Sequence, residues 1–242
     1  MTQAFSNIRI LDFTQVLAGP FAAQQLSLLG AEVIKVEQPG DGDQIRRLIC
    51  GDELRAQGLS PSYLMCNVNK RGIVLDLKSP EAKEIVTRLI KESDVVMENF
   101  KAGQMDRLGF GYDFSKSIKP DVIYCSISGY GQKGPKAGVP AYDGAIQAAS
   151  GMMNVNGHPE TGPTRAGFFL VDMTTGLTAA LAISSALYRR RETGEGQHLD
   201  VAMLDSALTL QASRLVCHTV EGEEARLDGN ESITRMPTAN VY

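Results

Sequence analysis

The sequence contains no tryptophan and is poor in the residues that hold metals or form disulfides. Its four cysteines are far apart, and none lies in the C-x-x-C spacing of a zinc knuckle or a redox pair. The three histidines are equally dispersed. We therefore expect reduced cysteines and no metal site.

Long apolar runs and an excess of positive charge are also missing. No stretch approaches the roughly 20 apolar residues that span a bilayer, and the first seven residues lack the basic and apolar regions of a signal peptide. The net charge of −4 gives no general attraction to nucleic acid or anionic lipid. We expect a cytoplasmic protein that binds neither nucleic acid nor a membrane.

What the sequence does contain is the pattern of a globular protein. Hydrophobic residues make up 43% and charged residues 21% of the 242 positions, which is enough for a sizeable core. Apolar runs with strand and helix patterns alternate along the chain. The runs expected to form strands are 8–13, 32–37, 72–77, 95–97, 121–127 and 197–201, and those expected to form helices are 21–29, 80–92, 173–190 and 204–220.

This alternation predicts an α/β fold with a Rossmann-like, doubly wound, mostly parallel sheet and flanking helices. We expect one domain over residues 1–220, followed by a polar linker at 221–242. The Gly- and Pro-rich segment 129–167 is too long for a plain connection. We therefore expect it to fold around a site, with a short helix within 142–153.

Several common enzyme signatures are absent from the sequence. Glu37 ends the second expected strand, where dinucleotide-binding folds carry a ribose-binding acid. However, residues 14–20 lack the G-x-G-x-x-G loop that lets a pyrophosphate approach the backbone. The Walker A, G-x-S-x-G and H-E-x-x-H patterns are missing as well. We expect no NAD cofactor, and an NAD-linked dehydrogenase is the weakest alternative.

One acid is notable for its position. Asp172 follows the apolar run 168–171 and precedes the expected start of a long helix. A carboxylate there can accept backbone N–H bonds and stay ionised near the positive helix end, which suits an ordinary N-cap as well as a positioned nucleophile. The basic pair Arg46–Arg47 likewise suits a solvated surface as well as phosphate binding. The residues alone leave these alternatives open.

Several short stretches, in order between Ile8 and Leu215, form a specific pattern when taken together. They are residues 11–20, 29–37, 69–71, 98–100 and 107–110, Tyr142–Asp143 with Gln147 and Ser150–Gly151, Asp172 with Gly176, and residues 193–197. In this set the sequence resembles the class III CoA-transferase family, typified by formyl-CoA and carnitinyl-CoA transferases. The resemblance implies the N-terminal, large-domain portion of such an enzyme, with coenzyme A as substrate and product and with no metal or NAD.

The resemblance also implies an activity, namely transfer of CoA from an acyl-CoA thioester to a carboxylic acid. Asp172 matches the family's catalytic aspartate, which forms a mixed anhydride and then an aspartyl-CoA thioester. The residues implied to line the CoA site, the basic ones facing phosphates, are Val16, Ala18, Asn69, Lys70, Arg71, Asn99, Phe100, Arg107, Tyr142 and Asp143. A homodimer, interlocked when the full-length chain is present, is implied as well.

The sequence departs from the family pattern at particular points. Leu17 stands where formyl-CoA transferases have Gln, so we expect a different acyl group. No glycine-rich loop follows Asp172. The related α-methylacyl-CoA racemases also resemble the sequence, but Tyr142 stands at their histidine, and tyrosine ordinarily ionises only near pH ~10. Racemisation is therefore the alternative activity.

Length is a further departure from the family pattern. Family members are longer and carry a second, small domain, so we expect the linker to lead to a domain that this chain does not contain. A non-catalytic CoA-binding module is the alternative that follows from this expectation.

Overall fold

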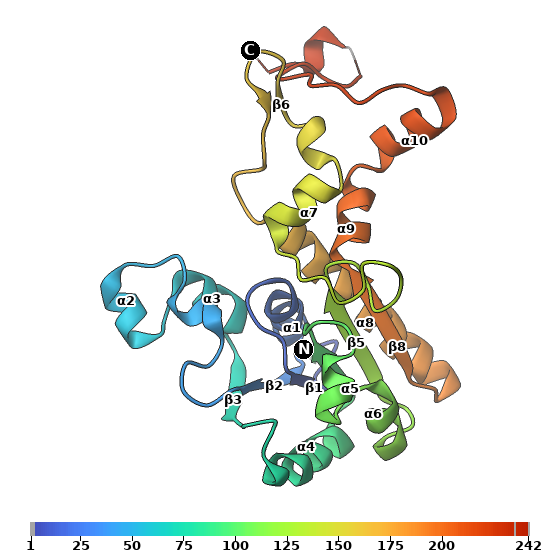
Figure 1. The fold of residues 1–242 in the computed structure, drawn as a ribbon. Coiled ribbons are helices and arrows are strands. Elements are labelled where there is room, and N and C mark those ends of the chain that lie inside the picture. The colour runs from blue at the N-terminus through green and yellow to red at the C-terminus, as the bar shows by residue number, and fades with distance from the viewer. Residues whose placement is uncertain (1–2, 235, 242) are drawn as a thin grey trace.

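A six-stranded sheet forms the centre of the molecule (Figure 1). The computed structural model describes residues 3–234 and 236–241. The strands are β1 (Arg9–Asp12), β2 (Glu32–Glu37), β3 (Lys70–Val74), β4 (Val95–Glu98), β5 (Ile123–Ser128) and β8 (Gln197–Ala202). They lie in the order β3-β2-β1-β4-β5-β8 and each neighbouring pair is parallel. Strand order reverses between β1 and β4, as in doubly wound sheets, so the predicted Rossmann-like α/β fold is confirmed.

The ends of β3 differ from the sequence prediction. The strand begins at Lys70 and ends at Val74, opposite Glu37 of β2, although the apolar alternation continues to Leu77. Leu75 and Leu77 are instead partly buried against the core on one face of the sheet. The alternation outlasts the strand because these side chains contribute to the core after the backbone has left the ladder.

Helices cover both faces of the sheet. On one face lie α1 (Ala18–Leu28) and α8 (Leu170–Thr193), and on the other lie α4 (Pro80–Glu92), α5 (Gln104–Leu108) and α6 (Tyr112–Ile118). Successive strand residues alternate between the faces: Ile10 packs with α1 and α8, whereas Leu11 packs with α4. Because both faces are buried, the strands are apolar on both sides.

α8 is the one helix in the described part of the chain that is long and apolar enough to cross a membrane. In this fold it is a core helix. Ala179, Ala180 and Ala186 are buried in the core that α8 shares with α1, and 44% of its most apolar window is buried. Packing against the sheet and α1 therefore accounts for the buried apolar residues of α8, whereas Leu177, Leu181 and Tyr188 are exposed.

An excursion between β2 and β3 extends beside the sheet (Figure 1). A 3-10 turn (Gln44–Arg47) leads to α2 (Asp52–Gln57) and α3 (Pro61–Asn67), which the sequence analysis does not predict. Ser60 caps α3 by accepting the N–H of Tyr63, and Pro61 occupies the first helical position. The local start signal is therefore present, but the helix is too short to show a period.

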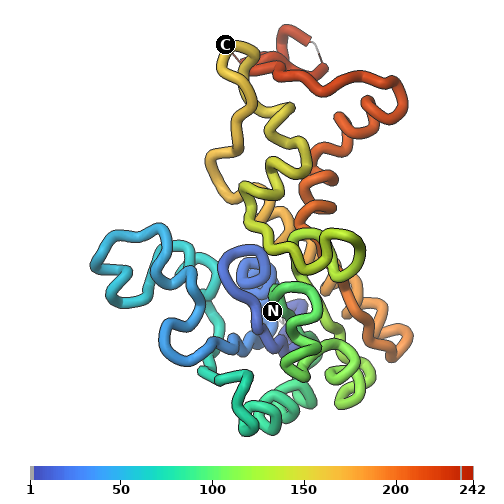
Figure 2. Tube along the Cα trace, in the orientation of Figure 1, coloured from blue at the N-terminus to red at the C-terminus, as the bar shows by residue number. Residues whose placement is uncertain are grey.

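A second excursion lies beyond the carboxyl edge of the strands (Figures 1 and 2). After β5 come α7 (Asp143–Ala149), a 3-10 turn (Met152–Asn154) and the hairpin of β6 (Gly157–His158) and β7 (Gly162–Pro163); after β8 come α9 (Met203–Leu210) and α10 (Ala212–Glu221). The single helix predicted over 204–220 is therefore wrong, since the chain breaks at Gln211 into two. The helix predicted within 142–153 ends at Ala149.

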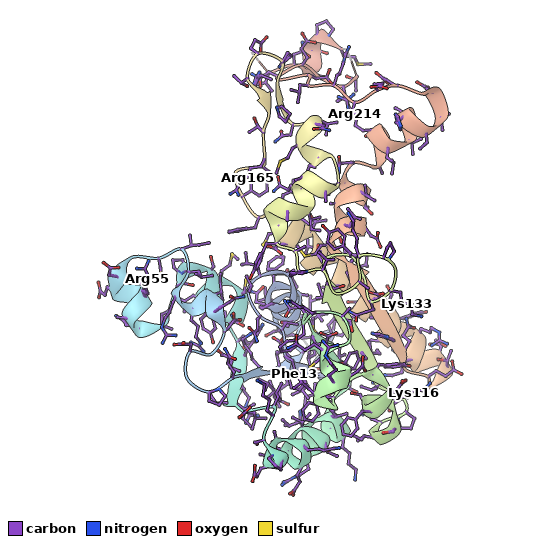
Figure 3. All side chains as sticks on the ribbon, in the orientation of Figure 1. Phe13, Arg55, Lys116, Lys133, Arg165 and Arg214 are labelled. Carbon is purple, nitrogen blue, oxygen red and sulfur yellow. The ribbon has the colours of Figure 1, made fainter. Side chains whose placement is uncertain are left out.

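The segment predicted as a linker packs on the elements beyond the carboxyl edge (α7, the β6–β7 hairpin, α9 and α10), which we call the upper layer. Gly229 donates its N–H to the carbonyl of Gly157 at 3.0 Å, and Arg214 of α10 forms an ion pair with Asp228. Within its described residues, 222–234 and 236–241, the 3-10 turn Pro237–Ala239 is the one helical element. Figure 3 places Arg165 and Arg214 in the upper layer, well apart from Phe13 in the main core. The domain boundary at residue 220 stays a prediction.

Candidate active site

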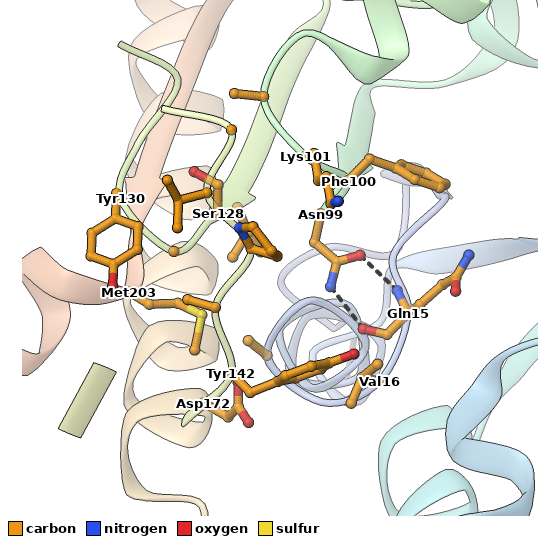
Figure 4. A pocket seen from close by; sticks show the side chains of 18 of the residues that line it. Gln15, Val16, Asn99, Phe100, Lys101, Ser128, Tyr130, Tyr142, Asp172 and Met203 are labelled. Atoms are coloured by element: carbon orange, nitrogen blue, oxygen red, sulfur yellow. Dashed lines mark hydrogen bonds between the residues drawn. The ribbon is translucent and has the colours of Figure 1, made fainter. Parts of the chain in front are cut away.

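A cavity of about 220 Å³ opens at the carboxyl edge of β1, β4 and β5 (Figure 4). Ligands of open α/β sheets bind at this edge, where the strand order reverses. Its walls come from the loops after β1, β4 and β5 and from the first turns of α8 and α9. The predicted site residues that line it are Val16, Ala18, Asn99, Phe100, Tyr142 and Asp172. No histidine lines it among the described residues.

Asp172 lies in the first turn of α8. The helix begins at Leu170 with Phe169 as its N-cap, so Asp172 is its third residue, and the N-cap interpretation of Asp172 is wrong. The side chain is 9% exposed and lines the cavity. Burial, and then the nearby charge of Asp143, raise the pKa of Asp172 to about 7. A carboxyl that loses its proton near neutrality in a dry cavity can act as a nucleophile.

Asp143 caps the N-terminus of α8, because the N-cap residue Phe169 has no side-chain hydrogen-bond acceptor. Its Oδ2 accepts the backbone N–H of Val171 at 2.7 Å and of Asp172 at 3.0 Å, and its Oδ1 accepts the Gln147 amide at 2.6 Å. Asp143 is buried and does not line the cavity. Its place in the structure is therefore behind Asp172, where it fixes the first turn of α8 and supplies negative charge.

Gly176 lets α8 and α1 approach closely next to the cavity. A Cβ atom at Gly176 would lie 2.8 Å from the carbonyl oxygen of Ala18 and 2.8 Å from Cδ1 of Phe21. No larger side chain fits there without moving a helix. Because Gly176 is one turn after Asp172, this contact brings the N-terminus of α1 beside the carboxyl group.

The first turn of α1 presents backbone donors at this point. The N–H groups of Leu17, Ala18 and Gly19 have no acceptor in the part of the chain that the structure describes, and Leu17 and Ala18 line the cavity. A helix N-terminus with free N–H groups favours negative charge. Asp172 and this helix end thus line the same cavity, where an oxyanion could be stabilised.

Asn99 joins two walls of the cavity. Its Oδ1 accepts the N–H of Gln15 at 2.8 Å and its Nδ2 donates to the carbonyl of Gln15 at 2.7 Å, as the dashed lines in Figure 4 show. The next residue, Val16, has a φ of 68°, which is costly for a β-branched side chain. Its N–H donates to buried Asp43 at 3.0 Å. The amide of Asn99 and the carboxylate of Asp43 thus hold this loop in shape.

Tyr142 is the N-cap residue of α7 and has 65% of its surface exposed. In Figure 4 its ring lies between Asp172 and Val16, at the rim of the cavity. Sequence reasoning assigned Tyr142 to the cofactor-binding residues, and the structure brings it to the same cavity as Asp172.

A second cavity of about 200 Å³ lies next to the first. Gln15 and Phe100 line both cavities. The second also includes Leu75, Asp76 and Lys78, which follow β3, together with residues of β2 and α5. Lys78 could not be predicted from the sequence, because a lysine after a strand has no distinguishing signal until the fold places it at the carboxyl edge.

Residues 69–71, which the resemblance implied for the CoA site with Lys70 and Arg71 facing phosphates, line neither cavity. Lys70 is 2% exposed in its side chain and donates from Nζ to Asp12 Oδ2 and to the carbonyl of Pro20, both at 2.9 Å. Asn69 bonds Ser27 at 2.9 Å, and exposed Arg71 pairs with Glu32 at 2.6 Å.

The ion pair between Lys70 and Asp12 changes the pKa of Asp12. Burial acts to raise the pKa of Asp12, but Lys70 and then Lys35 outweigh it and hold that pKa below its usual value. The structure thus gives Lys70 a buried position in the sheet.

Arg107 also lies outside both cavities. It is an exposed residue of α5, and its Nη1 would lie 3.3 Å from a Cβ atom at Gly103.

Within residues 3–234 and 236–241, no group of three or more His, Cys, Asp or Glu side chains could hold a metal ion.

Comparison with known proteins identifies relatives over nearly all of the chain. A profile of CoA-transferase family III matches residues 5–242. The chain is 40% identical over 228 residues to a succinate–glutarate CoA-transferase from Agrobacterium fabrum and 42% identical over 227 residues to an acetyl-CoA:oxalate CoA-transferase from Acetobacter aceti. Each alignment covers 93% of this chain and 57% of the relative, so the chain spans little more than half their length.

A solved structure supports the same relationship. A crystal structure of a CAIB/BAIF family protein from Brucella suis superposes on this fold with a TM-score of 0.86 and 37% sequence identity. The superposition covers 94% of this chain and 60% of that one.

Proposed function

The chain belongs to CoA-transferase family III, and from that premise we propose that the protein moves CoA from an acyl-CoA thioester to a carboxylic acid with Asp172 as its nucleophile. The observation that supports this most is the position of Asp172, a desolvated carboxyl in a cavity beside the free N–H groups of α1. The exposed aspartates of the chain have no such surroundings.

In the proposed reaction, Asp172 attacks the carbonyl carbon of the donor thioester. The C–S bond breaks, CoA leaves as a thiolate, and a mixed anhydride of Asp172 and the acyl group forms. The thiolate then attacks the Asp172 carbonyl, which releases the donor acid and leaves an aspartyl-CoA thioester. The acceptor carboxylate enters by the reverse sequence, and Asp172 is regenerated.

Each step passes through a tetrahedral oxyanion beside Asp172. We assign its stabilisation to the N–H groups of Leu17, Ala18 and Gly19 at the start of α1, because fixed donors in a dry site need no reorganisation during reaction. Asp143 holds the first turn of α8 so that the carboxyl stays aligned. Tyr142 at the rim would keep water from hydrolysing the anhydride.

The two adjoining cavities suit the two ends of CoA. The thioester would occupy the cavity with Asp172, and the nucleotide end would lie in the second cavity, with the pantetheine arm passing Phe100, which lines both. Lys78 in the second cavity would supply positive charge for the phosphates. Asn99 contributes by fixing the Gln15 loop, since its amide is already bonded there.

The acyl group is a further part of the proposal. Leu17 is 2% exposed and lines the cavity, so an apolar side chain stands where the resemblance predicts a Gln in formyl-CoA transferases. We therefore propose an acyl group other than formyl. The homodimer and the cytoplasmic location stay predictions; exposed Leu177, Leu181 and Tyr188 on α8 are apolar side chains that a dimer could cover.

The direct test is detection of the covalent intermediate. The chain is mixed with a panel of acyl-CoAs, and intact mass is measured before and after hydroxylamine treatment. We expect a hydroxylamine-labile adduct that maps to the peptide containing Asp172 and is absent from Asp172→Asn. An adduct of equal yield in Asp172→Asn would contradict the assignment.

A further inference from the structure

A chain of polar groups, buried at Glu98 and Ser126 and exposed at His198, lies beside the cavity and takes no part in the proposed chemistry. Glu98 at the end of β4 is 4% exposed and is the ladder partner of Ser126 in β5. The Ser126 hydroxyl lies beside the Glu98 carboxyl, where it acts to lower the pKa of Glu98, and it lies 2.9 Å from Nε2 of His198 in β8. Three neighbouring strands thus contribute one chain of polar groups.

One end of this chain reaches the cavity wall. Oε2 of Glu98 accepts the backbone N–H of Phe100 at 2.8 Å, and Phe100 lines both cavities. Asn99, between them in sequence, makes the two hydrogen bonds to Gln15 described above. The Glu98 carboxyl therefore fixes the turn at Asn99 and Phe100, which lies between the two cavities.

The surroundings of Glu98 contain acids and neutral groups. Burial is the main cause that raises the pKa of Glu98, to about 7, and Asp106 of α5 and Asp200 of β8 raise it further. The Ser126 and Phe100 hydrogen bonds oppose this shift. On β5, Tyr124 lies on the same face of the sheet as the carboxyl and Cys125 lies on the opposite face. Burial raises the pKa of both, so they remain neutral.

The other end of the chain is the imidazole of His198. The ring of His198 stacks on Tyr112 of α6, with ring centres 4.9 Å apart, and meets Tyr124 edge-on. Burial is the main cause that lowers the pKa of His198. Asp200, Asp106 and Asp113 act against that effect, and Lys133 adds to it. A proton taken up near neutral pH therefore binds at Glu98.

Proton uptake at Glu98 reverses the direction of the chain. With Glu98 ionised, Ser126 donates to the carboxylate and accepts from a protonated Nε2 of His198. With Glu98 protonated, its O–H donates to Ser126, Ser126 donates to Nε2, and the imidazole proton must sit on Nδ1. Glu98 gains one proton, Ser126 keeps one, and His198 stays neutral in the other tautomer.

The same event weakens the contact with the cavity wall. A hydrogen bond from an N–H to a carboxylate is shorter and stronger than one to a neutral acid. Phe100 therefore loses part of its anchor when Glu98 is protonated. Asn99 follows Glu98 directly, so the bonds that hold the Gln15 loop depend on the same turn.

We propose that Glu98 is a positioning residue for the CoA-binding wall: its ionised carboxylate holds the turn at Asn99 and Phe100, and proton uptake through the Glu98–Ser126–His198 chain releases that turn. This inference rests on the proposed function, because it assigns the wall to CoA. It concerns the shape of the site and adds no step to the transfer reaction.

The test begins with NMR of the 242-residue chain between roughly pH 5 and pH 9. The backbone amide of Phe100 and the ring nitrogens of His198 are expected to change together with a midpoint near pH 7, and the ring is expected to switch tautomer without becoming charged. Glu98→Gln keeps an acceptor for Phe100 and donates to Ser126 as the protonated acid does. It is expected to show the low-pH signals of the wild type at every pH.

A control separates this event from the titration of the nucleophile. Asp172→Asn removes the other carboxyl that ionises in this range, and the transition at Phe100 and His198 is expected to persist in it. Ser126→Ala keeps the bond between Glu98 and Phe100 but is expected to uncouple the tautomer of His198 from pH.

Calorimetric binding of CoA then connects the chain to the wall. The wild-type affinity is expected to fall about fivefold from pH 8 to pH 6, and Glu98→Gln is expected to bind at the weaker level at both pH values. If Glu98 has only a structural role, Glu98→Gln is expected to have a lower melting temperature. The CoA affinities of the wild type and Glu98→Gln would then depend on pH in parallel. Absence of the Phe100 transition in the wild type, or its persistence in Glu98→Gln, would overturn the inference.

The two proposals fail in different ways. If the wild type binds no CoA at any pH, the proposed function is contradicted, while the NMR signals still report whether the proton chain exists. If CoA binds with the same affinity at pH 6 and pH 8, the function stands and the positioning role of Glu98 is refuted.

Discussion

Replacing Asp172 by Asn should stabilise the protein at alkaline pH. The folded protein raises the pKa of Asp172 from 3.8 to about 7, so the native state binds this proton more tightly than the unfolded chain does. Such a group contributes stability at low pH, and that contribution is lost as the pH rises from about 4 to about 7. Above pH 7 the native state must hold a buried carboxylate near Asp143.

The magnitude follows from the two pKa values. At about 1.4 kcal/mol for each pH unit, the interval from 3.8 to about 7 corresponds to about 4 kcal/mol. This is an upper bound, because the Asn amide must also be buried and the N-terminus of α8 favours a negative charge by ~0.5 kcal/mol. We expect Asp172→Asn to be about 2–3 kcal/mol more stable than the wild type at pH 8 and equally stable near pH 4.

Urea unfolding at several pH values measures this difference. Asp205→Asn is the matched control, because Asp205 occupies the same third position in α9 but is exposed. It should lose up to ~1 kcal/mol through its interaction with the helix end, with little change above pH 5. A constant difference between Asp172→Asn and the wild type from pH 4 to pH 8, or a less stable variant at pH 8, would refute the reasoning.

Three further changes test the surroundings of the cavity. Gly176→Ala should lose about 1–3 kcal/mol in urea unfolding despite its gain in helix propensity, since its Cβ meets Ala18 at 2.8 Å; Gly144→Ala in α7, whose nearest neighbour is 3.6 Å away, should be neutral or gain up to ~1 kcal/mol. Asp143→Asn should lower the pKa of Asp172, so formation of the proposed adduct should reach half its maximum at a lower pH, and should lose about 1 kcal/mol through the weaker cap; an unchanged pH profile would contradict this. Lys70→Met should cost about 3 kcal/mol at pH 7 because it leaves the buried carboxylate of Asp12 unpaired, and the loss should shrink as the pH falls below about 4; equal losses at both pH values would exclude the ion-pair explanation.

The sheet could be predicted from sequence because its pattern is local. Apolar strands, Ser79–Pro80 before α4 and Gly30 after α1 can each be recognised within a few residues. α2 and α3 could not, because six or seven residues give too few turns for a period to appear. The break at Gln211 was also hidden, since the apolar pattern runs on from α9 into α10.

The site could be predicted only in part, because several roles depend on partners that are remote in sequence. The sequence predicts a phosphate-binding role for Lys70, but the strand order places it beside Asp12, which is 58 residues away in sequence. Asp143 reads as a ligand contact until the fold turns it towards the backbone of α8. Asp172 was predicted through the family resemblance, whereas its dry surroundings come from helix packing that no single stretch of sequence specifies.

The walls of the cavity that Asp172 lines come from segments as far apart as Gln15 and Met203. Met203 and Ala207 pack with Val171, directly before Asp172, so a nascent chain that has not yet delivered α9 leaves this carboxyl in water, where it is a weak nucleophile. The reactivity that we propose for Asp172 would therefore arise only once the last strand and its following helix have docked. A reagent that acylates Asp172 would therefore distinguish the fully folded protein from a merely collapsed one.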